Sequence, residues 1–189
     1  IEYCKGIFTI LSSCAARQLE EVTFRRNTIP VQELFDAAGK YFRKVTKNRT
    51  EKVELIIEPM DAKVIGDVNQ LRFLFENLID EALAVREEGV IRLQARKDNE
   101  YIRFLFTDTR REKSVTELNQ LFYPNLARMT SGEKGELRGT EYLICKQIIR
   151  DHDEFAGRRG CRINAEPAEG GGFTVYFTCL LYTSDAADE

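Results

Sequence analysis

The sequence predicts an α+β fold, a two-layer α/β sandwich in which helices cover one face of a mixed, mostly antiparallel sheet. One observation is that three segments repeat apolar residues at helical spacing: 31–45, 68–85 and 140–151. Another is that five shorter segments have the continuous or alternating apolar pattern of strands: 53–57, 90–96, 101–107, 161–165 and 173–179. The two kinds of segment are mixed along the chain, so an all-helical or an all-strand fold is not expected.

The helix at 68–85 has the clearest pattern in the chain. Asp67 precedes it and is expected to be its N-cap, because a carboxylate can accept the free N–H groups of a first turn. Its buried face is expected to carry Leu71, Leu74, Phe75, Leu78, Ile79 and Ala82. The helix at 31–45 follows Pro30, which interrupts the preceding helical pattern. Its expected buried face carries Leu34, Phe35, Ala38, Tyr41 and Phe42.

The strand segments are separated by clear turns. Residues 97–100 join the two alternating segments before and after them, which predicts a β-hairpin. The last two strands are separated by a glycine-rich turn at 169–172. Between these pairs, residues 109–138 are polar around one short apolar patch, which predicts a short helix and then a mobile loop. A long irregular segment inside a compact domain is usually functional.

The two ends of the chain are expected to differ from the central domain. Apolar residues recur every three or four positions through 1–26, which predicts a helix that packs against a partner. Residues 180–189 (LLYTSDAADE) resemble a translated sequencing adapter and are interpreted as a non-native tail. The expected organisation is therefore a leading helix at 1–27, a globular domain at 28–179 and the tail at 180–189.

Composition excludes several classes of function. The chain has 28 basic and 31 acidic residues, and removing Asp185, Asp188 and Glu189 of the tail brings the net charge from −3 to 0. A neutral domain gives no electrostatic reason to expect nucleic acid as a partner. No apolar run is long enough to predict a membrane contact in this segment. Five cysteines without a C-x-x-C pair, and one histidine, favour packed, reduced thiols and a cytoplasmic location over a zinc site.

Five blocks of sequence follow one another in a defined order: IGDVNQLR–FENLIDEA at 65–82, FTDT at 106–109, ELNQLFYP at 117–124, GTEYLICKQII at 139–149 and EPAEGGGFT at 166–174. Together they resemble the asparagine, glycine and phenylalanine boxes of the C-terminal region of sensor histidine kinases. The resemblance implies the histidine-kinase type of ATPase fold, within the superfamily that also contains gyrase. It also implies that the helix at 1–27 is the second helix of a dimerisation hairpin.

The resemblance also implies a set of nucleotide-binding residues: Asn77, Asp80, Glu81, Asp108, Thr109, Gly139 and Thr140. Asp108 would accept the adenine amino group, and Glu81 would stand where the family has the asparagine that binds magnesium. The implied cofactors are ATP and Mg²⁺. No catalytic residue is assigned. From the residues alone, Asp108 could equally form a strand-end turn, and Asn77 could be a buried hydrogen-bonding residue.

Several positions depart from the family pattern. Asp108 and Thr109 are followed by Arg110, Arg111 and Glu112 where the first glycine box has glycines, so side chains are expected to crowd that turn. Glu141 replaces the second glycine of the other glycine box. With Glu81 it would repel a triphosphate unless a cation intervened.

Two side-chain roles are weighed from the sequence. Charged loop residues could clamp phosphates but are usually only solvated: Arg110, Arg111, Arg128 and Lys134. His152 lies inside the ATP-binding domain and not on an upstream hairpin helix, so a structural role is expected for it and not phosphate acceptance.

The leading hypothesis is a pseudokinase, a histidine-kinase-like ATP-binding domain of a two-component-type signalling protein that acts as a dimeric relay. The alternative is an active ATP-dependent protein histidine kinase that phosphorylates a histidine upstream of Ile1. A gyrase-type ATPase is a third hypothesis, which the leading helix disfavours. The expected partners are a second copy of the chain, joined through the N-terminal helix, and a response regulator.

Overall fold

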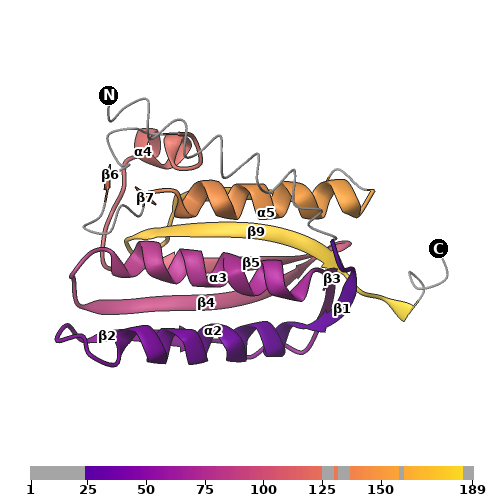
Figure 1. Cartoon of the computed structure of the whole chain (residues 1–189), viewed down its shortest axis with the longest axis horizontal. Helices are drawn as coiled ribbons and strands as arrows, with labels where there is room; N and C mark the ends of the chain where they lie inside the picture. Colours follow the sequence, from indigo (N-terminus) through magenta and orange to yellow (C-terminus); the bar gives the residue numbers. More distant parts are fainter. Residues whose placement is uncertain (1–23, 125–129, 132–136, 158–159, 185–189) are drawn as a thin grey trace.

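The computed structural model describes residues 24–124, 130–131, 137–157 and 160–184 of the chain. Within them the elements run β1 (Asn27–Pro30), α2 (Val31–Thr46), β2 (Val53–Ile57), β3 (Lys63–Gly66), α3 (Val68–Leu83), β4 (Gly89–Asp98), β5 (Tyr101–Asp108), α4 (Val115–Gln120), β6 (Thr130–Ser131), β7 (Leu137–Arg138), α5 (Glu141–Phe155), β8 (Ile163–Pro167) and β9 (Phe173–Leu181). Figure 1 shows α2, α3 and α5 beside the sheet. The predicted α+β sandwich is confirmed.

The sheet is mixed and mostly antiparallel, with the order β1-β3-β9-β5-β4-β2. Only β2 and β4 pair in parallel among the described strands. Because β5 pairs with β9 along residues 173–180, β8 and β3 share the other edge of β9, one after the other. The long hairpin of β4 and β5 therefore lies at the centre, and β5 ends at Asp108.

The core lies between the helices and one face of the sheet. Phe35 of α2, Phe75 of α3, Phe104 of β5 and Phe177 of β9 are fully buried and contact one another, with ring centroids 4.7 to 6.3 Å apart. Edge-to-face and stacked pairs of this kind add to the free energy gained by burying the rings. Thus α2 and α3 pack on the face of the sheet that carries Phe104 and Phe177, and α5 packs against α3 and β9.

The N-cap predicted for α3 is confirmed. Asp67 Oδ1 accepts hydrogen bonds from the backbone N–H groups of Asn69 and Gln70, at 3.0 and 3.1 Å. The bounds of α2, α3 and α5 agree with the predicted helices to within a few residues. No helix among the described residues is both long enough and apolar enough to cross a bilayer.

The expected number of strands is wrong. The sequence predicted five strands, but β1 and β3 also belong to the main sheet, and β6 and β7 form a separate short pair. β1 and β3 have four residues each, too few for a clear alternating pattern, and are held by pairing with distant segments.

In the structure, β9 extends two residues past the expected domain boundary at residue 179. Leu180 is buried, Leu181 packs on the core, and both pair with β3, so the domain continues through the end of β9. That residues 180–189 derive from a sequencing adapter stays a prediction. The predicted helix at 1–26 lies mostly outside the described residues, as does most of the predicted loop at 125–138.

Candidate nucleotide site

Asp108 is a buried carboxylate that is held by the arginine two residues after it. Its Oδ1 accepts the Nε–H and the backbone N–H of Arg110, at 2.9 and 3.0 Å, and its Oδ2 accepts from Nη2 at 2.9 Å. The Asp108 side chain is 1% exposed and the Arg110 side chain 0%. This is a bidentate ion pair out of contact with water, the geometry in which a guanidinium and a carboxylate interact most strongly.

Arg110 also binds the end of α3. Nη2 donates to the carbonyl of Ala82 at 2.5 Å and Nη1 donates to the carbonyl of Glu87 at 2.9 Å. The guanidinium is thus surrounded by the Asp108 carboxylate on one side and two carbonyls on the other. Four of its five N–H groups have an acceptor within the domain.

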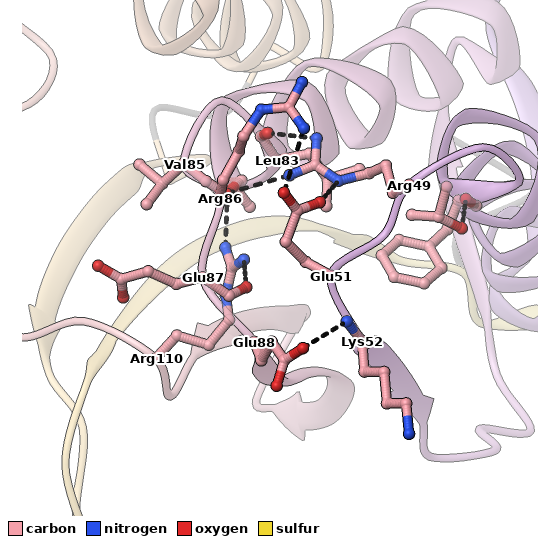
Figure 2. Close-up of polar contacts among 12 residues, drawn as sticks. Arg49, Glu51, Lys52, Leu83, Val85, Arg86, Glu87, Glu88 and Arg110 are labelled. Carbon is pink, nitrogen blue, oxygen red and sulfur yellow. Dashed lines mark hydrogen bonds and ion pairs between the residues drawn. The ribbon is translucent and has the colours of Figure 1, made fainter.

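A second arginine, Arg49, reaches the same end of α3 from the loop after α2. Its Nη1 and Nη2 donate to the carbonyls of Leu83 and Val85, at 2.7 and 3.2 Å. Figure 2 shows Arg49 and Arg110 approaching residues 83–87 from two different segments. The last turn of α3 contains no basic residue of its own. The two guanidinium groups therefore supply the cations that a helix C-terminus favours.

Two glycines allow the close approaches around this pair. A Cβ at Gly89 would lie 2.8 Å from Arg110 Cγ, and a Cβ at Gly172 would lie 2.1 Å from the carbonyl oxygen of Asp108. Both glycines have positive φ, 140° and 85°. Gly172 comes from the glycine-rich turn before β9, which explains why that turn lacks side chains: it lies against the end of β5.

The predicted site residues of α3 have different surroundings. Asn77 is buried and donates from Nδ2 to the carbonyl of Phe73 at 2.8 Å, a bond within its own helix. Asp80 accepts the Tyr41 hydroxyl at 2.6 Å. Desolvation raises the pKa of Asp80, and the nearby Glu141 carboxylate raises it further, whereas the bond from Tyr41 acts in the opposite direction. Glu81 follows on the same helix and is partly exposed.

At the start of α5 the Glu141 carboxylate binds the backbone of Gly139, one of the predicted nucleotide-binding residues. The N–H of Gly139 donates to Oε2 of Glu141 at 3.1 Å. Thr140 is the N-cap residue, but its side chain makes no capping hydrogen bond. Thr109, at the end of β5, bonds instead to the carbonyl of Val90 through both N–H and Oγ1, at 3.1 and 2.6 Å. The N–H groups of Gly139 and Thr109 and the hydroxyl of Thr109 thus donate to acceptors within the domain.

The opposite ends of α3 and α5 are joined through His152. Its Nδ1 lies 2.8 Å from the carbonyl of Ile148, and its Nε2 accepts the backbone N–H of Asp67 at 3.1 Å. The ring is buried, and Phe24 lies edge-on to it at 4.8 Å. The sequence-based expectation of a structural role fits this position, near the opposite end of α5 from Glu141.

The structure brings only part of the predicted site together. Arg110 joins Asp108 to the end of α3, and the Glu141 carboxylate at the start of α5 is close enough to Asp80, in the last turn of α3, to raise the pKa of Asp80. The contacts of Arg49 and Tyr41 were not predicted from the sequence. For Arg110, the sequence predicted crowding of the turn or a phosphate contact, and not an ion pair with Asp108. The one available signal was an arginine two residues beyond a strand-end aspartate.

The metal assignment to Glu81 is not supported by a ligand cluster. Among the residues that the structure describes, no group of three or more histidine, cysteine, aspartate or glutamate side chains could hold a metal ion. Magnesium in nucleotide sites is held by one or two carboxylates plus phosphate oxygens and waters, so such a cluster is not required. Glu81 as a magnesium ligand stays a prediction.

Two of the groups that the resemblance assigns to an adenine nucleotide already have partners within the domain. The carboxylate that would accept the adenine amino group already accepts three N–H groups of Arg110, and the N–H of Gly139 already has a carboxylate partner. The Asp108 carboxylate is thus bound to Arg110, and the Gly139 N–H is bound to Glu141.

Comparison with known proteins places this arrangement in context. Residues 66–183, more than half of the chain, match the family described as histidine kinase-, DNA gyrase B-, and HSP90-like ATPase. The signal transduction histidine-protein kinase BaeS of Escherichia coli K12 is 25% identical over 136 residues, which are 70% of this chain and 28% of that protein. The chain therefore spans about a quarter of the length of this relative.

Solved histidine kinases have the same fold. The catalytic domain of ThkA superposes with a TM-score of 0.63 at 18% identity, covering 82% of this chain and 97% of that domain. Full-length ShkA in complex with AMPPNP gives 0.64 at 14% identity, with 87% and 32% covered. ThkA in complex with the response regulator protein TrrA gives 0.63 at 17% identity, with 96% and 50% covered.

Proposed function

This chain belongs to the family of histidine kinase-, DNA gyrase B- and HSP90-like ATPases, and we propose that it is a degenerate member, a pseudokinase domain that relays a signal without using ATP. The main support for this proposal is the buried ion pair of Asp108 and Arg110. The carboxylate assigned to adenine by resemblance is neutralised and enclosed by the chain's own side chain, so adenine would have to displace a bidentate ion pair.

The carboxylates near the predicted phosphate position also support weak or lost ATP binding. Glu141 carries a negative charge at the start of α5, bonded to Gly139, and its field raises the pKa of Asp80 on α3. A triphosphate placed here would meet Glu141, Asp80 and Glu81. Like charges at such distances are unfavourable unless a cation separates them. ATP and Mg²⁺ binding is thus proposed to be weak or lost.

We propose that the intact protein is a cytoplasmic homodimer joined through the segment before residue 27, and that a response regulator is its downstream partner. The support is the likeness to histidine kinases, one of which, ThkA, was solved with the response regulator TrrA. Sedimentation of a protein that includes the whole N-terminal segment tests the dimer. A monomer at micromolar concentration would contradict it.

The alternative function is an active protein histidine kinase that phosphorylates a histidine upstream of this chain. The observation in its favour is that the adenine acceptor Asp108 is retained at the end of β5. The two functions are separated by incubating the full-length protein with labelled ATP and Mg²⁺. The pseudokinase proposal expects no acid-labile phosphohistidine above that of an Asp108→Asn variant, whereas autophosphorylation that depends on Asp108 would establish the enzyme.

A further inference from the structure

The acceptors that surround the Arg110 side chain are those of a cation site. They line the space beside Asp108: both carboxylate oxygens of Asp108 itself and the carbonyls of Ala82 and Glu87. The N–H groups that the structure shows bonded to the Asp108 carboxylate all come from Arg110. A ring that offers both donors and acceptors would leave part of this set unmatched, whereas a guanidinium offers donors only.

The shape of the space also matches a guanidinium. Asp108 binds Nε and Nη2 side by side, while the two carbonyls receive the outward N–H groups of Nη1 and Nη2. An ammonium group is a point charge and cannot make this planar fork. The absence of a side chain at Gly89 leaves room for the stem, because a Cβ there would meet Arg110 Cγ at 2.8 Å.

From these contacts we infer that the space beside Asp108 is a binding site for a planar guanidinium or amidinium cation, and that Arg110 occupies it as a tethered internal ligand. This site rests on the proposed function, in which Asp108 holds Arg110 in place of adenine. The hydrogen bonds of Arg110 join the end of α3, the end of β5 and Glu87, which lies two residues before β4 begins.

Chemical rescue tests this site. In the full chain, Arg110→Ala removes the guanidinium and leaves Asp108 buried without a counter-ion, so the melting temperature should fall by roughly 10 °C. Adding free guanidinium chloride at roughly millimolar levels, far below denaturing concentrations, should then raise the melting temperature of this variant along a saturable curve. Methylguanidinium should act in the same way, and ammonium or sodium chloride at equal ionic strength should not.

Matched controls define the outcome. The wild-type chain, with its site filled, should show no rise with guanidinium, and neither should Asp108→Asn/Arg110→Ala, which lacks the carboxylate. Arg110→Lys should not restore full stability, because an ammonium cannot bridge the carboxylate and both carbonyls. Equal responses of Arg110→Ala and the double variant to guanidinium, or no response in either, would overturn the inference.

A measurement on the wild-type chain covers the case in which Arg110→Ala does not fold. The Nε–H of Arg110, assigned by comparison with Arg110→Lys, should exchange slowly with solvent in ¹⁵N NMR spectra, whereas exposed arginines exchange fast. Fast exchange would overturn the inference. Titration of Arg110→Ala with adenosine reports separately on the proposed function: guanidinium rescue without adenosine binding would remove the adenine role of Asp108 and retain the cation site.

Discussion

Acidification should destabilise this domain through His152, the only histidine in the chain. The carbonyl of Ile148 can only accept, so Nδ1 carries the proton and Nε2 is the acceptor for the N–H of Asp67. Protonating Nε2 would place one N–H group against another. Burial is the main cause that lowers the pKa of His152 below 6.5, although the bond to Ile148 and the carboxylates of Asp67 and Asp151 oppose the shift.

The sign and the size of the effect follow from linkage. Because the folded pKa lies below the unfolded value of 6.5, the unfolded chain binds more protons as the pH falls through 6.5. The contribution of neutral His152 to the free energy of unfolding is therefore fully present above pH 6.5. It is lost as the pH falls, and the loss levels off below the folded pKa. At pH 5 the loss cannot exceed about 2 kcal/mol, the free energy of protonating a histidine of pKa 6.5 at that pH. This corresponds to roughly 4 to 8 °C in melting temperature for a chain of this length.

The assay compares thermal unfolding of the wild-type chain and a His152→Gln variant at pH 7 and pH 5. Glutamine can still accept from Asp67 but does not titrate, so the carboxylates common to both chains cancel in the difference. The wild type should lose more stability than the variant, and the His152 ring signals should titrate below 6.5 by NMR. Equal losses in the two chains, or a ring that titrates at or above 6.5, would refute the reasoning.

Three further predictions use other contacts. Truncation after Cys179 should lower the melting temperature, because it removes the buried end of β9 and its pairing with β3; an unchanged value would restore the earlier boundary. Arg49→Ala should cost about 1 to 3 kcal/mol in urea unfolding, since carbonyls at the end of α3 lose their donors; a neutral effect would mean that water replaces the guanidinium. Tyr41→Phe should raise the pKa of Asp80, followed by carboxyl NMR, because it deletes the bond that stabilises the ionised form; a lowered pKa would contradict the assignment.

Local signals predicted the helices well. The N-cap of α3 and the apolar face of the same helix are encoded within one short stretch, so Asp67 and the residues after it could be assigned from spacing alone. The bounds of β2 and the central hairpin were predicted for the same reason, because their strands pair with near neighbours or show clear alternation. In contrast, β1 and β3 depend on partners far along the chain, and four residues carry too little pattern.

The candidate site was harder to predict because its decisive contacts are not local. The sequence identified Asp108 by resemblance and noted that Arg110 stands where a glycine is usual. It could not show that Arg110 turns inward, since the carbonyls that hold it belong to Ala82 and Glu87, 28 and 23 residues earlier. The same holds for Tyr41 and Asp80, which come from two different helices.

Calorimetric titration of the wild-type chain with ATP, with and without Mg²⁺, tests the central claim most directly. Because Asp108 is paired with Arg110 and Glu141 occupies the start of α5, the account predicts no detectable binding without metal. With Mg²⁺ it predicts a Kd weaker than about 1 mM, which is less than about 4 kcal/mol of binding free energy. Saturable, metal-independent binding with a micromolar Kd would contradict the account, since it would show that the nucleotide displaces Arg110 at little cost.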